Sequence, residues 1–280
     1  MSVTIIHEGG ENRILSLKPR TMPVGDRRCC AGVMGVDDAP PLIARKDWLK
    51  CVDLSHAVLE ILDQDGYSLC HSFGGTQANE MAHVLLGRDQ VQLSAGNLAG
   101  QVTGYRDAGA GVDEVLAVIT SVGQVARSVI GQNDYRGRDW PSDWKTKAKL
   151  YKVNAYDCGH EDVTDGMASG LLRGNVSLLG TNAFGGGHAV VGCGYWIDAN
   201  DVVRFFGPNS WAESYNGFTS ALLDSLSKNH PNPELSRVLR TKGAGFWVYQ
   251  ERQLTAINSY GAFVVDGVQA LDTDNVPPLA

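Results

Sequence analysis

A cysteine at the start of a helical pattern is the side chain in this sequence best suited to covalent chemistry. Cys70 follows a loop rich in turn-forming residues, and the apolar residues from Ala78 to Leu85 repeat at the spacing of one buried helix face. A thiol at a helix N-terminus lies beside unsatisfied backbone N–H groups and the positive end of the helix dipole. Both lower the thiol pKa toward the reactive thiolate. Because buried cysteines are often inert, a nucleophilic role for Cys70 depends on the residues that accompany it.

Two later segments supply a base and an orienting group. His188 opens the run His-Ala-Val-Val-Gly, which is typical of a buried strand, and Asn209 lies in Pro-Asn-Ser-Trp211. The histidine follows Cys70 by 188 − 70 = 118 residues and the asparagine by 209 − 70 = 139 residues. Taken alone, each is an ordinary strand or turn residue. Together with a thiol they form a nucleophile, a proton carrier and a group that orients the imidazole.

The expected elements divide the chain into a mostly helical half, before about residue 145, and a mostly stranded half. Strands segregated from helices indicate the α+β class. Helices are expected at 57–62, 70–86, 95–102 with Ser94 as the cap, 113–129, 162–172 and 217–228. Strands are expected at 150–156, 175–180, 188–191, 202–206, 246–249 and 262–265, with a hairpin turning at Gly9-Gly10, a loop over 21–42 and a loosely held tail over 272–280.

Composition excludes several classes of protein. The 280 residues are 43% apolar and 20% charged, which is the balance of a globular protein with a substantial core. The net charge of −7 argues against a nucleic acid or an anionic membrane as partner. The N-terminus has no signal-peptide pattern and no apolar run is long enough to span a bilayer, so we expect a cytoplasmic or otherwise intracellular protein. The six cysteines then need not form disulfides, and none has zinc-ligand spacing.

Three blocks of the sequence resemble the papain-like cysteine peptidases. Gln64-Asp-Gly-Tyr-Ser-Leu-Cys-His-Ser-Phe73 is similar to the family's Gln-Gly-x-Cys-Gly-Ser-Cys-Trp-Ala-Phe, with the same six-residue offset from glutamine to cysteine. Gly187-His-Ala-Val-Val-Gly-Cys-Gly194 resembles the family's histidine strand, and Asn209-Ser-Trp211 resembles its Asn-Ser-Trp motif. The resemblance spans about residues 46–218 and keeps the family's order of cysteine, histidine and asparagine.

The sequence departs from the family pattern around the nucleophile. Tyr67 stands where the family has a half-cystine, in agreement with a reducing compartment, and His71 replaces a tryptophan. His71 is a second candidate base, but a residue adjacent to Cys70 on a helix points elsewhere, so we prefer His188. Gly74 and Gly75 weaken the start of the helix by up to about 1 kcal/mol each relative to alanine.

The resemblance implies a two-lobed fold with the active site in the cleft between the lobes. We expect an N-terminal arm over 1–45, a helical lobe over 46–145, an antiparallel β-sheet lobe over 146–270 and a tail over 271–280. The arm does not resemble the family's inhibitory pro-region, and the sequence allows it either behind the fold or across the cleft.

The resemblance also implies a function, a thiol peptidase that hydrolyses peptides or proteins without metal or organic cofactor. Its site residues are Cys70 as nucleophile, His188 as acid and base, Asn209 to orient the histidine, Gln64 to stabilise the oxyanion and Trp211 as a shield. Two alternatives stay open. One is a binding or structural component of a larger protein assembly on the same scaffold, and the other is a different acyl transfer, amidase or transglutaminase-like.

Overall fold

The computed structural model describes residues 3–6, 12–19, 33–34, 39–88, 90–158, 163–184, 186–198, 200–211, 245–250 and 262–268, and every structural statement below refers to these. The described elements include the helices α1 (Cys70–Leu85), α2 (Ala95–Thr103), α3 (Val112–Ser121), α4 (Trp144–Ala148) and α5 (Val163–Leu172). They also include three single turns of 3₁₀ helix, at Arg45–Asp47, Ser55–Ala57 and Lys149–Tyr151.

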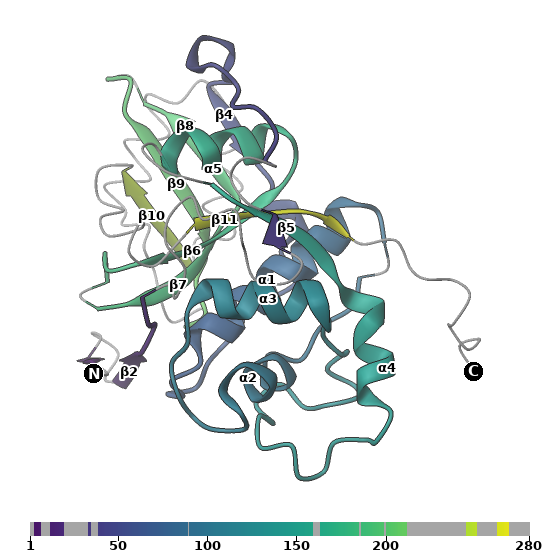
Figure 1. Ribbon diagram of the computed structural model, residues 1–280. Helices are drawn as coiled ribbons and strands as arrows, with labels where there is room; N and C mark the ends of the chain where they lie inside the picture. Colours follow the sequence, from purple (N-terminus) through teal and green to yellow (C-terminus); the bar gives the residue numbers. More distant parts are fainter. Residues whose placement is uncertain are drawn as a thin grey trace.

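The strands form two larger sheets and a hairpin. One sheet has the order β3-β5-β11-β6-β7 and the other β10-β9-β8-β4, while β1 and β2 pair with each other. The strands are β1 (Val3–Ile6), β2 (Asn12–Leu15), β3 (Val33–Met34), β4 (Cys51–Asp53), β5 (Val153–Asp157), β6 (Val176–Thr181), β7 (His188–Gly192), β8 (Gly194–Ile197), β9 (Val203–Pro208), β10 (Phe246–Gln250) and β11 (Ala262–Val268). Pairing is antiparallel throughout except between β3 and β5. Figure 1 shows α1, α2 and α3 gathered below the sheets, so the predicted α+β class is confirmed.

Helix α1 lies at the centre of the molecule, and its two glycines let it pack closely. A Cβ on Gly74 would lie 3.1 Å from a methyl group of Leu178 on β6, and a Cβ on Gly75 would overlap Val115 on α3. The glycines that weaken α1 as an isolated helix are thus required by its neighbours on both sides. Helix α5 covers the opposite face of the five-stranded sheet (Figure 1), where Gly170 packs against Val264.

Glu80 is a buried carboxyl in the middle of α1. Its Oε1 accepts a hydrogen bond of 2.6 Å from the backbone N–H of Leu93, whereas its Oε2 is buried without a hydrogen-bond partner. Burial raises the pKa of Glu80 to about 8, with the Leu93 hydrogen bond opposing that shift. The folded protein therefore holds Glu80 protonated at a pH where the unfolded chain ionises it.

We expect the substitution Glu80→Gln to remove part of the pH dependence of stability. A carboxyl whose folded pKa is raised contributes stability that is complete below its unfolded pKa of about 4.3 and is lost as the pH rises toward 8. The wild type should lose up to about 1.4 kcal/mol per pH unit over that interval relative to Glu80→Gln. Chemical denaturation of both proteins between pH 5 and pH 8 measures the difference. Parallel curves for the two proteins would show that Glu80 is ionised in the fold.

The helix predicted at 95–102 is confirmed, because the Ser94 side chain accepts a hydrogen bond from the N–H of Asn97 and caps α2. Two other helix predictions are wrong in extent. Where a helix is predicted at 57–62, the structure has only a single helical turn, Ser55–Ala57. The chain then runs irregularly to Asp63, which forms a β-bridge with Trp211. The second, α3, ends at Ser121 rather than residue 129 because Gly123 has φ +92° and packs against the backbone of Ala148.

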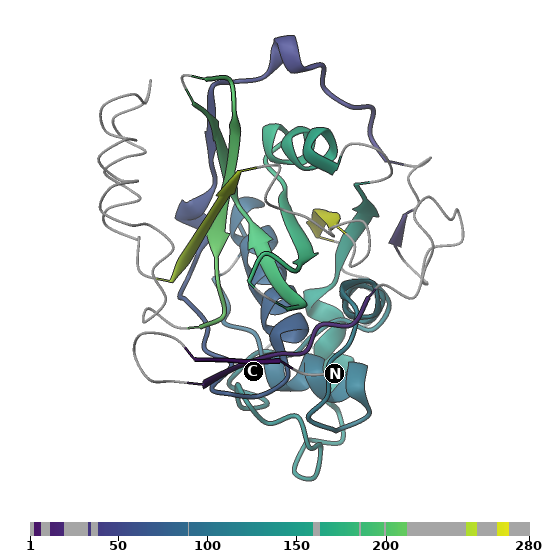
Figure 2. The ribbon, with the colours of Figure 1, turned by 90° about the vertical axis from the view of Figure 1, so that its left-hand side faces the viewer.

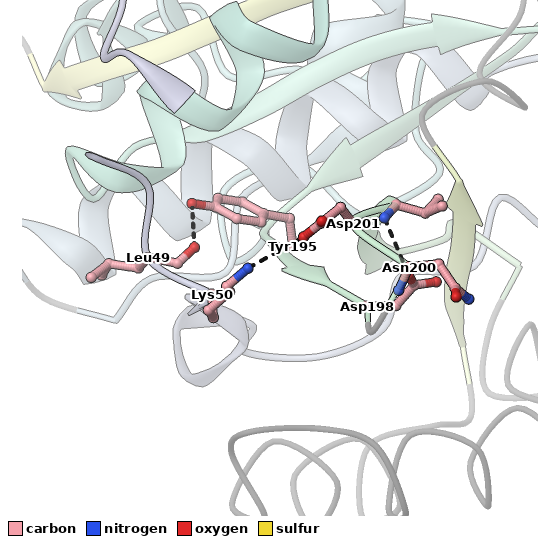
Figure 3. Close-up of polar contacts among 7 residues, drawn as sticks. Leu49, Lys50, Tyr195, Asp198, Asn200 and Asp201 are labelled. Carbon is pink, nitrogen blue, oxygen red and sulfur yellow. Dashed lines mark hydrogen bonds and ion pairs between the residues drawn. The ribbon is translucent and has the colours of Figure 1, made fainter. Parts of the chain in front are cut away.

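Strand β4 comes from the first half of the chain but pairs with β8 in the second, an arrangement that the sequence analysis did not anticipate. Polar contacts join the residues just before β4 to β8 and to the turn that follows it (Figure 3). The Tyr195 hydroxyl donates to the Leu49 carbonyl at 3.1 Å, and Lys50 lies 3.5 Å from Asp201 in the turn between β8 and β9. The predicted boundaries of the arm, the two lobes and the tail remain predictions.

The predicted strands of the second half are present, each within a few residues of its expected bounds. The expected hairpin is present as β1 paired with β2, but its turn at Gly9-Gly10 lies outside the described residues. The helix expected at 217–228 and the tail at 272–280 also lie outside them. Within the described part, no helix has the length and apolar character needed to cross a bilayer.

Candidate active site

Cys70 is the first residue of α1 and is completely buried. The start of α1 packs against the start of β7, where Ala189 lies beside both Gly74 and the Cys70 thiol. Burial raises the pKa of the Cys70 thiol above its ordinary value, and hydrogen bonds from the backbone of Ala189 and from Ser16 oppose that shift. The sequence predicts a lowered pKa from the helix terminus. In this covered state, loss of water around the sulfur outweighs that effect.

His188 and Asn209 form a buried hydrogen-bonded pair. The His188 Nε2 atom lies 2.7 Å from the Asn209 Oδ1 atom, so Nε2 carries the hydrogen in this pair and Nδ1 is the other ring nitrogen. His188 is the first residue of β7, and Asn209 directly follows β9. The two strands belong to different sheets, and they cross closely because Gly207 has no side chain to collide with the Val191 carbonyl.

Two aromatic rings enclose the His188 imidazole. Trp211 stacks on it with a centroid distance of 4.5 Å and an interplanar angle of 30°, and Phe184 meets it edge-on at 5.0 Å. All three rings are nearly or fully buried. The cage excludes water from the His188–Asn209 hydrogen bond. The sequence analysis predicted Trp211 but missed Phe184, for which the signal was an aromatic residue just before the glycines that precede His188.

Hydrogen bonds with Tyr67 and Ser210 hold the Gln64 side chain in place. Its Nε2 donates to the Tyr67 carbonyl at 2.9 Å, and its Oε1 accepts from the Ser210 hydroxyl at 2.9 Å. Its backbone N–H also donates to the Ser210 carbonyl at 3.1 Å. Ser210 was missed as a site residue although it lies inside the Asn-Ser-Trp motif. It fixes which end of the Gln64 amide carries the nitrogen.

Residues 16–18, here called the strap, lie over Cys70. The Leu17 N–H donates to the Gly187 carbonyl at 3.0 Å and the Lys18 N–H donates to the Ala110 carbonyl at 3.2 Å, so the strap bridges the segments before β7 and before α3. The Ser16 hydroxyl donates to the Ser68 carbonyl at 2.8 Å. In Figure 2 the purple hairpin and the chain leaving it lie against the helical half of the molecule. This part of the N-terminal arm thus lies across the site rather than behind the fold.

The strap contacts the Cys70 sulfur through Ser16. A hydrogen bond that lowers a thiol pKa is one donated to the sulfur, and the Ser16 backbone N–H is the donor here, because the one hydrogen of the Ser16 hydroxyl is donated to the Ser68 carbonyl. Gly109 makes the approach feasible, because a Cβ there would overlap the Ser16 carbonyl oxygen. The strap therefore covers Cys70 in this structure.

The structure brings Cys70, His188, Asn209, Gln64 and Trp211 to one place, and their catalytic roles remain predictions. His71 is completely buried, and neither ring nitrogen has a hydrogen-bond partner in the described part.

The described cysteines form no disulfides, and the described residues include no cluster of metal-binding side chains. Cys51, Cys70, Cys158 and Cys193 are all unpaired as disulfides. Among the described residues, no group of three or more histidine, cysteine or acidic side chains is arranged to bind a metal ion.

The arrangement of the elements is that of the papain-like fold, as comparison with solved structures shows. Xylellain, a cysteine protease from Xylella fastidiosa, matches with a TM-score of 0.64 and 14% identity over 91% of this chain and 97% of that one. Digestive procathepsin L 3 of Tenebrio molitor matches with a TM-score of 0.58 and 17% identity over 89% of this chain and 76% of that one. Bromelain from Ananas comosus matches with a TM-score of 0.57 and 12% identity over 78% and 99%. No protein-family model matches the sequence, and neither does any curated protein.

Proposed function

We propose that this protein is a cysteine peptidase that hydrolyses peptide bonds through a thioester on Cys70. The observations that carry the proposal are the buried His188–Asn209 pair, 2.7 Å apart, and the Cys70 thiol at the start of α1, which is hydrogen-bonded to the backbone of Ala189, the residue after His188. The papain-like fold of the chain supports it, because the solved structures that share the fold include cysteine proteases. The peptide or protein substrate is part of the same proposal.

In the proposed reaction, His188 Nδ1 takes the proton of the Cys70 thiol, and the thiolate attacks the carbonyl carbon of the peptide bond. The C–N bond then breaks as the imidazolium gives its proton to the leaving amine, leaving a thioester. His188 next removes a proton from water, which attacks the thioester and restores the thiol. Asn209 keeps the imidazole in one orientation by accepting the Nε2 hydrogen throughout.

The oxyanion is stabilised by two donors in this proposal. The Cys70 backbone N–H belongs to the first turn of α1, where N–H groups have no partner within the helix. The Gln64 amide, which donates to the Tyr67 carbonyl in this structure, is the second donor to the oxyanion in the proposed reaction. Ser210 holds the amide in the required orientation.

A binding or structural role is the second candidate, and the complete burial of Cys70 favours it. A thiol that is permanently covered attacks no substrate. Whether the strap opens distinguishes the two candidates. If it opens, Cys70 becomes accessible to a peptide and the protein can be a peptidase. If it never opens, the protein can serve only as a scaffold.

Covalent labelling with a peptidyl epoxide tests the proposed function. We expect one adduct, on Cys70, because the thiolate opens the epoxide ring while a thiol without a base reacts slowly. Cys51→Ser is the matched control and should keep the adduct, and Cys70→Ser should lose it. The same labelling is run on Leu17→Ser, in which the buried strap side chain is lost. An unlabelled Cys70 in both the wild type and Leu17→Ser would refute the peptidase.

A further inference from the structure

A cavity lies between β5, helix α5 and residues 39–42, away from the candidate active site. Its volume is about 240 Å³, and its lining includes none of the five residues assigned to the proposed reaction. Helix α5 and helix α1, which carries Cys70, cover opposite faces of the five-stranded sheet (Figure 1). Sites for drug-sized ligands measure roughly 300–1,000 Å³, so this cavity suits a smaller molecule.

Residues 39–42, here called the apolar wall, form one side of the cavity and are fastened to α5. They read Ala-Pro-Pro-Leu, and the two proline rings restrict the backbone to one region of φ. The N–H of Ile43, the next residue, donates to the Ser169 hydroxyl at 2.9 Å, and the Arg173 guanidinium donates to the Pro41 carbonyl. The wall is therefore in place without a ligand, and its side chains offer only hydrocarbon.

Tyr156 brings a hydroxyl without a partner to the opposite side of the cavity. Its side chain is 3% exposed, and its hydroxyl has no hydrogen-bond partner in the described part of the chain. Tyr156 and Cys158 pack in the apolar cluster that contains α5, whereas Ala155 packs in the cluster that contains α1, so the first two face the cavity side of β5. Because buried hydroxyls in native proteins are nearly always hydrogen-bonded, a ligand in the cavity would supply the missing acceptor.

Arg173 brings a positive charge to the same cavity. Its Nη1 donates to the Ser169 carbonyl at 3.2 Å and its Nη2 to the Pro41 carbonyl, and both acceptors are neutral. Among the described residues, Arg173 forms no ion pair with a carboxylate. A guanidinium has more N–H donors than these two bonds use, so Arg173 keeps both a charge and donors for a ligand.

The acidic side chains of the described part leave the cavity without a negative charge. Asp157 pairs with Phe263 on β11, and Phe263 packs in the cluster that contains α1. Because residues paired across two strands lie on the same face, the Asp157 side chain also points away from the cavity. Asp165 on α5 is in an ion pair, Asp266 on β11 accepts a hydrogen bond of 2.7 Å, and neither lines the cavity.

We propose that this cavity is a binding site for a small organic carboxylate with a short apolar chain. The carboxylate would accept hydrogen bonds from Arg173 and from the Tyr156 hydroxyl, and the chain would lie against the apolar wall. An anionic acceptor satisfies both groups, because a guanidinium only donates and the Tyr156 hydroxyl has a hydrogen to donate. The site does not depend on the proposed peptidase activity, since it shares no residue with the proposed reaction.

Binding of isovalerate to the full chain tests this proposal, with the methyl signals of the ligand followed in an NMR titration. Isovaleramide has the same shape without the charge, and inorganic phosphate is an anion without an apolar chain. We expect isovalerate to bind with a Kd in the millimolar range or below, which is a reasonable affinity for so small a ligand. The other two probes should bind at least about tenfold more weakly, because each lacks one half of the recognition.

The variant Tyr156→Phe separates a ligand-binding role from a structural one. It should weaken isovalerate binding by about tenfold, as expected for a lost hydrogen bond to a charged group. Its melting temperature should be unchanged, because the hydroxyl that it removes has no partner in the described protein. The matched control is Tyr195→Phe, which removes a hydroxyl bonded to the Leu49 carbonyl. That variant should melt at a lower temperature and bind isovalerate normally.

The variant Arg173→Gln tests the charge. It should weaken isovalerate binding by about tenfold and remove the decline in affinity that added salt causes in the wild type. The matched control is Arg45→Gln, which removes an arginine that pairs with Asp165 and does not line the cavity. It should change neither the affinity nor its salt dependence. If a thermal melt shows that Arg173→Gln loosens the apolar wall, Tyr156→Phe decides the matter, because it keeps the bonds of Arg173.

Three results would overturn the inference. Equal affinities for isovalerate and isovaleramide would show that the cavity does not recognise an anion. Tighter binding of phosphate than of isovalerate would show that the apolar wall contributes nothing. Absence of isovalerate binding, or unchanged binding in Tyr156→Phe, would show that the cavity is not the site. None of these readouts involves Cys70, so failure of the peptidase proposal is recognised separately.

Discussion

Replacing His188 by alanine is expected to lower kcat on the order of 10⁴-fold or more, because the variant loses both the base that forms the thiolate and the acid that protonates the leaving amine. KM should change little, since the imidazole contributes to the transition state far more than to peptide binding. The measurement is steady-state kinetics on peptides cleaved by the wild type. Alkylation of Cys70 at pH 6 should slow in parallel.

The matched control is His56→Ala, which removes an exposed histidine from the 3₁₀ turn Ser55–Ala57. It should leave kcat and the alkylation rate unchanged. A His188→Ala protein that cleaves peptides within tenfold of wild type would remove His188 from the mechanism. Loss of stability with unchanged chemistry would assign the His188–Asn209 hydrogen bond a purely structural role.

Replacing Gln64 by alanine is expected to lower kcat by about a hundredfold to a thousandfold, which corresponds to about 2.7–4 kcal/mol of transition-state stabilisation. The Gln64 amide is donated to the oxyanion only when the carbonyl carbon becomes tetrahedral, so KM should be nearly unchanged. Ser210→Ala should produce a smaller loss in the same direction, because it releases the amide oxygen from its 2.9 Å hydrogen bond. Both variants are measured on the peptides used for His188→Ala.

Gln92→Ala is the matched control for Gln64, since it removes an exposed glutamine whose side chain is bonded to Glu60. It should leave kcat unchanged. If Gln64 serves only the fold, its removal should instead cost roughly 0.5–1.5 kcal/mol of stability and leave turnover unaffected. A thermal melt of each variant beside its kinetics distinguishes the two roles.

Local features of the sequence determined the helix that carries Cys70 and the strand that carries His188. Cys70 falls at the first residue of α1 because the apolar spacing and the preceding turn formers are short-range signals. The papain-like resemblance likewise depended on short blocks, and the structure places Cys70, His188, Asn209, Gln64 and Trp211 together. Local patterns failed where the apolar spacing continues beyond the last residue of a helix. Helix α3 ends before Gly123, whose left-handed backbone is set by a contact with Ala148.

Contacts between segments far apart in the chain were decided by the tertiary structure alone. The hydrogen bond between Ser210 and Gln64 joins residues 146 positions apart. It depends on where two distant segments of the chain meet, and no periodicity in the sequence indicates that. The strap is the clearest case, because nothing in the types of Ser16, Leu17 and Lys18 indicates that they cover Cys70. That position follows from two backbone hydrogen bonds and from the space left by Gly109. Sequence reasoning proposed the candidate reactive groups. The tertiary structure decided that the Cys70 thiol is covered and desolvated, which raises its pKa.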